Sequence, residues 1–377
     1  MTDIYSFEDI ARAGKVVPLE TVERLLHITE PVEQHDIVTN GSVKVKFTMP
    51  PNWNLDLKEM DPSNITSSQI EVEGVGKYYL SKNAILNALN QIGISDHYAY
   101  KTPGHLLAPH LEHWFANGMS KDTDIKMVTK GEYAVGFMRP DFKVISNLEV
   151  LKYVKRFFRD NKMKNDIYVD PNIVNSYSQT EIRLILSNDT FEVETERNGE
   201  KETDIWHLGL HISNSLITNT TTPLTFAGFL WERNSQAAIL PNLSNLIGYR
   251  RPYLQDPEDL KGWVLATLDQ VFSILPVEAE MVKQMPNHSL VGKMGPLTTD
   301  LFRSLKVHRK VQEGTLENLS LSGDMTSYGV MHAMAKTTSD PDLRISSKVV
   351  NHVQRVCGTL PGHADDMCDS CGRLHFD

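Results

Sequence analysis

The stretch 205–240, IWHLGLHISNSLITNTTTPLTFAGFLWERNSQAAIL, constrains the fold more than any other part of the sequence. Every second residue from Trp206 to Ile212 is apolar. A period of two is typical of a half-buried strand, because successive side chains point to opposite faces. After a polar link, the apolar run from Leu224 to Trp231 predicts a second, more fully buried strand. These two strands predict a sheet at the centre of the protein.

Asn-Gly pairs predict two tight turns between strands. Strands are expected over 181–186 and 191–195, and Asn198-Gly199 then returns the chain into the central stretch. Asn40-Gly41 separates two short alternating runs and predicts a second hairpin, because these residues adopt the positive φ angles of a type I′ turn. Gly74 and Gly76 lie inside a strand expected over 70–80, where they predict a bulge or bend.

Capping residues and a period of 3.6 predict the helices. Ser6 is expected to cap a short helix that Gly14 ends, and Pro276 is expected to end a long helix that begins at Pro257. Helices are expected over 6–13, 18–30, 81–92, 109–115, 147–161, 257–275, 299–311, 328–335 and 340–357.

The order of these elements predicts an α+β protein. We expect a strand-rich N-terminal and central region with a mostly antiparallel sheet, a helical C-terminal third and a small zinc knuckle at the C-terminus. The expected regions are 1–77, a helix and hairpin region; 78–252, a central α+β core; 253–340, a helical region; and 341–377, a helix with a zinc-binding tail.

Composition narrows the classes of protein to which the chain can belong. A hydrophobic content of 40% and a charged content of 23% are ordinary for a globular protein. The net charge of -10 argues against a protein that coats nucleic acid with its whole surface, but it allows a local basic groove. The acidic start does not resemble a secretory signal, and no apolar run approaches the ~18 residues that span a bilayer. We therefore expect a cytoplasmic protein with no membrane partner.

All three cysteines lie at the C-terminal end of the sequence and predict a structural Zn²⁺ site. Cys368 and Cys371 have the Cys-x-x-Cys spacing with which two thiolates hold one ion. Cys357 would be the third ligand, and His363 or His375 would complete a tetrahedron. The alternatives are a tail with three unused thiols and a redox pair of Cys368 with Cys371.

His105, His110 and His113 form a second cluster of possible metal ligands. His110 and His113 are spaced to share a helix face, as metal ligands in a helix bundle do. Glu112 directly precedes His113, so the His-Glu-x-x-His pattern of metalloproteases is not met. Core or solvated histidines are the simpler interpretation.

Basic side chains concentrate in rows on two expected helices, although the chain is acidic. The residues are Lys152, Lys155, Arg156 and Arg159 in the first row, Arg303, Lys306, Arg309 and Lys310 in the second, and Arg250 and Arg251 beside Tyr249. Such rows indicate a groove that follows a phosphate backbone, with aromatic side chains as stacking platforms for unpaired bases. Binding in one groove requires that both rows line it. A solvated helix face is the alternative interpretation.

Two segments resemble a phage and plasmid family known only as a domain of unknown function. Ser213-Asn214-Ser215 and the later FLWERN at 229–234 are similar to the family's Ser-Asn-Ser turn and the strand that follows it. The segment 134–151 is similar to the family's upstream strand, Tyr-Arg-Pro-like turn and helix, with Met138-Arg139-Pro140 as the turn. Arg233-Asn234-Ser235 stands where the family tends to carry Cys-Asn-Gly. The resemblance implies a viral or mobile-element origin and no mechanism.

These features predict a phage-encoded cytosolic protein of DNA metabolism that binds single-stranded nucleic acid, as an accessory in annealing or recombination. One alternative is a structural or assembly protein that forms homo-oligomers. Another is a metal-dependent enzyme built on His105, His110 and His113. The sequence has no Gly-x-Ser-x-Gly nucleophile elbow, which favours a binding protein over an enzyme.

Overall fold

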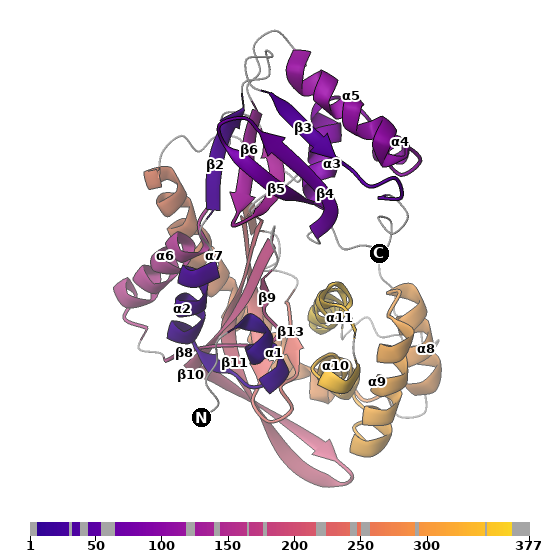
Figure 1. Cartoon of the computed structure of the whole chain (residues 1–377). Helices are drawn as coiled ribbons and strands as arrows, with labels where there is room; N and C mark the ends of the chain where they lie inside the picture. Colours follow the sequence, from indigo (N-terminus) through magenta and orange to yellow (C-terminus); the bar gives the residue numbers. More distant parts are fainter. Residues whose placement is uncertain are drawn as a thin grey trace.

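The computed structural model of the chain contains two β-sheets with helices packed around them (Figure 1). It describes residues 6–29, 32–37, 44–53, 65–117, 125–138, 144–163, 166–175, 179–215, 224–241, 247–249, 257–290, 294–343 and 345–363. The larger sheet, sheet A, has the strand order β1-β8-β10-β11-β12-β13, with β9 beside β10 and β14 beside β12. Its strands are β1 (Val17–Pro18), β8 (Ile167–Val169), β9 (Val174–Asn175), β10 (Gln179–Arg197), β11 (Glu200–Ser215), β12 (Leu224–Glu232), β13 (Ala238–Ile239) and β14 (Ile247–Tyr249).

The central stretch forms the middle of sheet A, as its alternation predicts. β10, β11 and β12 are antiparallel neighbours, and Trp206, Leu210 and Ile212 are buried on one face. Asn198 and Gly199 have φ angles of 53° and 83°, so the expected tight turn is confirmed. The two strands expected before this turn are one long strand, because β10 continues through an irregularity between Ile185 and Thr190.

Four helices cover one face of sheet A around one core. They are α1 (Phe7–Ala13), α2 (Leu19–Thr29), α6 (Asn147–Asp160) and the first half of α7 (Pro257–Gln284). Ser6 caps α1 in a capping box and Gly14 ends it at a φ of 59°, as expected. The apolar stripe of α6 is buried, and Phe157 and Phe158 both contact Phe272 of α7. Caps and prolines therefore predicted α1 and α2, and hydrophobic periodicity predicted α6 and the first half of α7.

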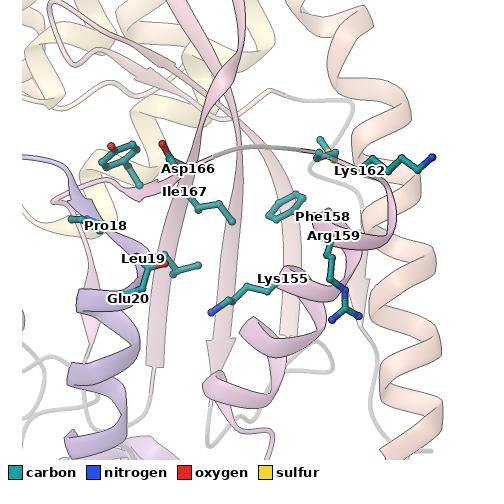
Figure 2. Close-up of a pocket in the computed structure, with 11 residues that line it drawn as sticks. Pro18, Leu19, Glu20, Lys155, Phe158, Arg159, Lys162, Asp166 and Ile167 are labelled. Carbon is teal, nitrogen blue, oxygen red and sulfur yellow. The ribbon is translucent and has the colours of Figure 1, made fainter.

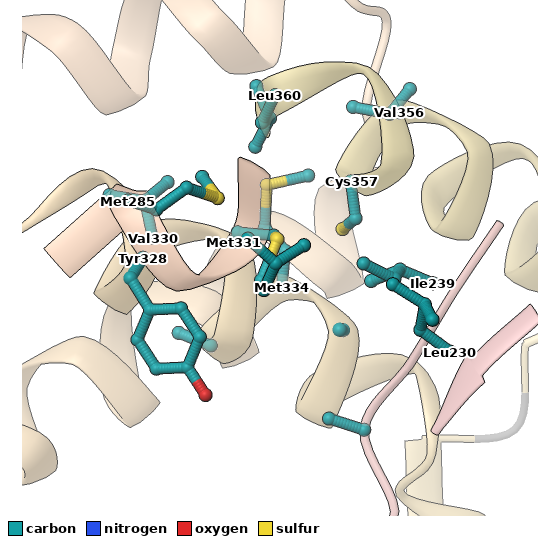
Figure 3. Packing of buried hydrophobic residues seen from close by; sticks show 14 of the residues in the cluster. Leu230, Ile239, Met285, Tyr328, Val330, Met331, Met334, Val356, Cys357 and Leu360 are labelled. Atoms are coloured by element: carbon teal, nitrogen blue, oxygen red, sulfur yellow. The ribbon is translucent and has the colours of Figure 1, made fainter. Parts of the chain in front are cut away.

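The last helices enclose a second core with the end of α7 and the edge of sheet A. They are α8 (Met294–Ser304), α9 (Arg309–Ser322), α10 (Ser327–Thr338) and α11 (Ser347–Thr359). Figure 3 shows Met331 and Met334 of α10 beside Cys357 of α11, facing Leu230 and Ile239 of the sheet. The helical C-terminal third is confirmed.

Sheet B differs from the sequence expectation in its strand pairing. Its strands are β2 (Val32–Ile37), β3 (Val45–Thr48), β4 (Ile65–Val72), β5 (Gly76–Ser81), β6 (Ile125–Lys130) and β7 (Tyr133–Met138), in the order β2-β6-β7-β5-β4-β3. The hairpin expected at Asn40-Gly41 is wrong, because β2 pairs with β6 and β3 pairs with β4 at opposite edges. The strands that pair with β2 and β3 lie further along the chain, and these strands determine the pairing. Asn40-Gly41 itself lies outside the described residues. Only β5 and β7 run parallel among the pairs described.

Three helices accompany sheet B. They are α3 (Lys82–Gln91), α4 (Asp96–Ala99) and α5 (Gly104–Asn117), and α3 and α5 bury apolar side chains against the sheet. Ser81 caps α3, and the chain leaves it through Gly93 at a φ of 70°, as expected. Gly74 turns the chain at a φ of 79° between two paired strands, so the single bent strand expected over 70–80 is a hairpin.

Several helix boundaries differ from the expectation because tertiary packing outweighed local breakers. α7 continues through Pro276, and α5 begins before Pro109 and contains it. The helix expected over 299–311 is broken between α8 and α9. Gly358 lies inside α11, where an added Cβ would stand 1.9 Å from the carbonyl oxygen of Leu240. The sequence predicts that Gly358 ends this helix, but the close approach of the Leu240 backbone is the better reason for a residue without a side chain at this position.

The α+β class, the mostly antiparallel sheets and the helical C-terminal third are confirmed. The predicted region boundaries remain predictions, and the hydrophobic cores group the chain in another way. Residues 7–29 pack with sheet A, whereas the apolar residues between Ile37 and Phe137 form the core of sheet B. Among the described residues, only the segment Asp259–Asn287 is long and apolar enough to cross a membrane. Its apolar stripe packs on sheet A, so length and composition argue only weakly for a membrane span.

Candidate nucleic-acid interface

A pocket of about 630 Å³ lies between the start of α2, the C-terminal half of α6 and β8 (Figure 2). Its lining comprises Pro18, Leu19, Glu20, Lys155, Phe158, Arg159, Lys162, Met163, Asp166, Ile167 and Tyr168. The volume falls within the range of ~300–1,000 Å³ that is typical of sites for small organic ligands. Apolar side chains form much of the wall, and cationic and anionic side chains share the rim.

Helix α6 supplies the cations beside this pocket. Lys152, Lys155, Arg156 and Arg159 are exposed on the side of the helix opposite its buried stripe. Lys155 Nζ lies 3.0 Å from the Glu23 carboxylate of α2. Asp160 lies 3.3 Å from Arg156 Nε and 3.2 Å from Arg159 Nη2. Hydrogen bonds from Arg159 and Arg156 lower the pKa of Asp160.

The second basic row lies elsewhere on the molecule. Arg303 is on α8, Arg309 and Lys310 begin α9, and Lys306 lies between these helices. Figure 1 shows α8 and α9 on the opposite side of the body from α6. The two rows therefore do not line one groove. Arg250 and Arg251 lie outside the described residues.

The histidines of α5 do not assemble a metal site. His110 Nδ1 is 3.4 Å from the hydroxyl of Tyr98, whose ring stacks on the imidazole. His113 Nδ1 is 3.2 Å from the side-chain amide of Asn117, one turn further along the helix. Within the described ranges, no group of three His, Cys, Asp or Glu side chains could hold an ion. The described residues therefore give no support to a metal centre on His105, His110 and His113, and the enzyme alternative stays a hypothesis.

Cys357 lies in the second hydrophobic core. It is fully buried, and burial raises the pKa of its thiol (Figure 3). A zinc ligand must be a thiolate, so this environment does not favour Cys357 as the third ligand. Cys368, Cys371 and His375, as well as the His363 side chain, lie outside the described part of the chain.

A buried polar network between sheet A and α11 escaped the sequence analysis. Arg183 of β10 donates a hydrogen bond to Asn351 of α11, and its guanidinium lies 3.7 Å from Asp170. Asn351 in turn donates to Glu181 at 2.6 Å, and His211 Nε2 is 3.7 Å from the same carboxylate. Burial lowers the pKa of His211, an effect that Glu181 opposes.

This network contains the residue types of many catalytic sites, but it is closed to substrate. A guanidinium beside a Glu-His pair could bind an anion and transfer a proton. The side chains of Arg183 and Asp170 are each only 1% exposed, however. We interpret the network as the polar attachment of α11 to the sheet. Charged residues within otherwise apolar strands were the signal that could have revealed it.

A second polar cluster joins the turn after β12 to α10. The Glu232 carboxylate accepts hydrogen bonds from the backbone amides of Asn234 and Ser235 and from the Ser235 hydroxyl. His332 Nε2 lies 3.1 Å from Ser235 Oγ and 3.9 Å from Glu232. In a catalytic triad the acid and the nucleophile bind opposite ring nitrogens, whereas here both approach Nε2. The cluster therefore stabilises the turn and does not activate the serine.

Arg233-Asn234-Ser235, which stands where the family with the resemblance tends to carry Cys-Asn-Gly, forms this turn. The resemblance itself remains a prediction. No known protein family, no curated protein and no solved structure matches this chain.

Proposed function

We propose that this protein binds single-stranded nucleic acid, with α6 and the pocket beside it as the contact surface. The observation that carries the proposal is a pocket of ligand size with Lys155, Arg159 and Lys162 at its rim. Lysine and arginine attract phosphates whatever the base sequence. Because the net charge of the chain is -10, the interaction depends on this local surface and not on the average charge.

The affinity is expected to be modest and sensitive to salt. Lys155 is paired with Glu23, and Arg159 shares Asp160 with Arg156. Exposed ion pairs of this kind contribute about 0–1 kcal/mol each, so phosphates can replace the carboxylates at small cost. Three phosphate contacts predict a slope of about -2 for log K against log salt on a single strand.

Reversing the charge of the rim is expected to abolish binding. In the variant Lys155→Glu/Arg159→Glu/Lys162→Glu, three attractive contacts with phosphate become repulsive. We expect the dissociation constant for a labelled single-stranded oligonucleotide to rise at least about 30-fold at 50 mM salt, because each lost contact contributes roughly 0.7–1 kcal/mol. Fluorescence anisotropy measures this change.

The second basic row offers a matched control. The variant Lys306→Glu/Arg309→Glu/Lys310→Glu changes the net charge by the same amount on the other side of the molecule. It also matches the backbone, because Lys306 and Lys162 both have positive φ angles, so each variant replaces one residue in that conformation. We expect this variant to weaken binding by less than about threefold, through the long-range field alone. Equal loss in both variants would contradict a role for the pocket. If the unmodified protein showed no salt-sensitive binding, the proposal would fail, and sedimentation would then test the alternative of an assembly protein.

We also propose that the C-terminal tail binds a structural Zn²⁺. Support comes from the sequence alone, because Cys368 and Cys371 have knuckle spacing and two histidines lie nearby. The burial of Cys357 among apolar side chains argues against its use. The remaining candidates, Cys368, Cys371, His363 and His375, suffice for a closed tetrahedral site.

Elemental analysis of purified variants tests this ligand set. We expect Cys368→Ser/Cys371→Ser to lose zinc, and Cys357→Ala to keep the zinc content of the unmodified protein. Cys357→Ala removes one sulfur from a packed core, so a loss of about 1–2 kcal/mol of stability is expected without loss of metal. Loss of zinc from a folded Cys357→Ala variant would show that Cys357 is a ligand after all.

A further inference from the structure

We infer that the pocket between α2 and α6 receives one nucleotide of a bound strand and prefers bases that carry an amino group. This inference rests on the proposed function. The observation behind the inference is that the pocket lining contains both cationic and anionic side chains. Lys155, Arg159 and Lys162 supply cations, whereas Glu20 and Asp166 supply carboxylates.

The two carboxylates and two of the three cations occupy different parts of the rim, whereas the third cation, Lys155, extends toward Glu23 of α2. In Figure 2, Glu20 and Asp166 lie on the side of α2 and β8, and Arg159 and Lys162 lie on the side of α6. A nucleotide has a complementary arrangement: its anionic phosphate fits the cationic side, and the hydrogen-bond donors on the edge of its base fit the carboxylate side. A simple anion such as inorganic phosphate would be repelled by the carboxylate side.

Both carboxylates are available to a ligand. Neither Glu20 nor Asp166 has a side-chain hydrogen bond or ion pair with another described residue, and both are exposed. Asp166 is fixed in place by its backbone, which exchanges two hydrogen bonds of 3.2 Å with Ser187. Glu20 is held in the first turn of α2. These acceptors therefore stay at the pocket without neutralising its cations.

The wall between the two charged sides is apolar. Leu19, Phe158, Met163 and Ile167 line it, and Tyr168 adds an aromatic ring. Bases present flat apolar faces, which pack against such side chains without regard to sequence. With a volume of about 630 Å³, the pocket accepts a unit of a strand and not an extended segment.

Carboxylate acceptors distinguish the bases by their exocyclic groups. Cytosine and adenine carry amino groups that donate hydrogen bonds, whereas thymine has a carbonyl oxygen at the corresponding position. At this exocyclic position a carboxylate accepts a hydrogen bond from an amino group and is repelled by a carbonyl oxygen, so thymine offers it only the ring N3–H as a donor. We therefore expect oligo(dC) to bind about tenfold more tightly than oligo(dT) to the full-length protein.

Titration of labelled oligo(dC) and oligo(dT) of about 12 nucleotides tests this preference, since single-strand sites span ~4–16 nucleotides. The variant Glu20→Gln/Asp166→Asn should bind oligo(dT) at least as tightly as the unmodified protein and should reduce the preference to about twofold or less. The matched control Glu313→Gln/Asp342→Asn removes two exposed carboxylates elsewhere and should keep the preference.

The outcomes separate this inference from the proposed function. If neither oligonucleotide binds, the proposed function is wrong, and this inference falls with it. Equal binding of both by the unmodified protein overturns only the inference. A preference that persists in Glu20→Gln/Asp166→Asn also overturns it, because another part of the protein would then select the base.

Discussion

Replacing Arg183 by methionine is expected to lower the free energy of unfolding by about 3–5 kcal/mol, the range for breaking a buried ion pair. The side chain is 1% exposed and lies 3.7 Å from the equally buried Asp170. Glu181, Asn351 and the guanidinium of Arg355 are further neighbours. Methionine fills much of the space but removes the buried cation that faces Asp170 and Glu181, and a buried charge without its partner is far less stable than an exposed one.

Urea unfolding at neutral pH measures this loss as a lower midpoint with an unchanged slope. Arg156→Met is the matched control, because its partner Asp160 is exposed, and we expect it to cost less than about 1 kcal/mol. Changing Asp170 and Glu181 to Asn and Gln in the Arg183→Met background should recover at least half of the stability, since no unpaired charge then remains. If Arg183→Met cost no more than Arg156→Met, the network would contribute little to holding α11.

Glu232→Gln is expected to destabilise the protein by about 2–3 kcal/mol at neutral pH. Burial would raise the pKa of this carboxyl, but its contact with His332 and the hydrogen bonds from the following turn lower it from 4.5 to about 2. The carboxylate accepts hydrogen bonds from the backbone amides of Asn234 and Ser235. A glutamine has only one acceptor oxygen and turns an NH₂ group toward these donors.

The effect of Glu232→Gln should depend on pH with a defined sign. A depressed carboxyl pKa stabilises the folded state fully above the unfolded value of 4.5, and this contribution is lost as the pH falls toward about 2. The difference in unfolding free energy between the unmodified protein and the variant should therefore be largest at pH 7 and should shrink below pH 4.5. The control Glu313→Gln, at a carboxylate paired with Arg309 and 60% exposed, should change stability by less than about 0.5 kcal/mol. A difference that stayed constant down to pH 3 would contradict the assigned role of the carboxylate.

Local patterns predicted much of the fold. β10 to β12, the turn at Asn198-Gly199, the cap at Ser6 and the helix α6 all follow from the periodicity or turn chemistry of neighbouring residues. The partners of β2 and β3 could not be predicted in this way, because the residues that pair with them lie far along the chain. A turn signal contributes little against the many hydrogen bonds of a sheet.

The candidate site also combines features that local patterns predicted with features that depend on distant parts of the chain. Helical spacing predicted that Lys155, Arg156 and Arg159 share the exposed side of α6. The pocket required α2 and β8 to meet that helix, and its carboxylates come from α2 and from the residue that precedes β8. The separation of the two basic rows likewise depends on how the helices pack against the sheets.

The sequence by itself determined the α+β class, the central antiparallel strands and the cationic side of α6, because each depends on contacts within a few residues. Only the tertiary structure decided which strands pair, that Arg183 and Glu181 meet Asn351 in the interior, and that Cys357 lies in an apolar core. These arrangements join residues widely separated along the chain. Their stability depends on burial, which no local pattern of residue types specifies.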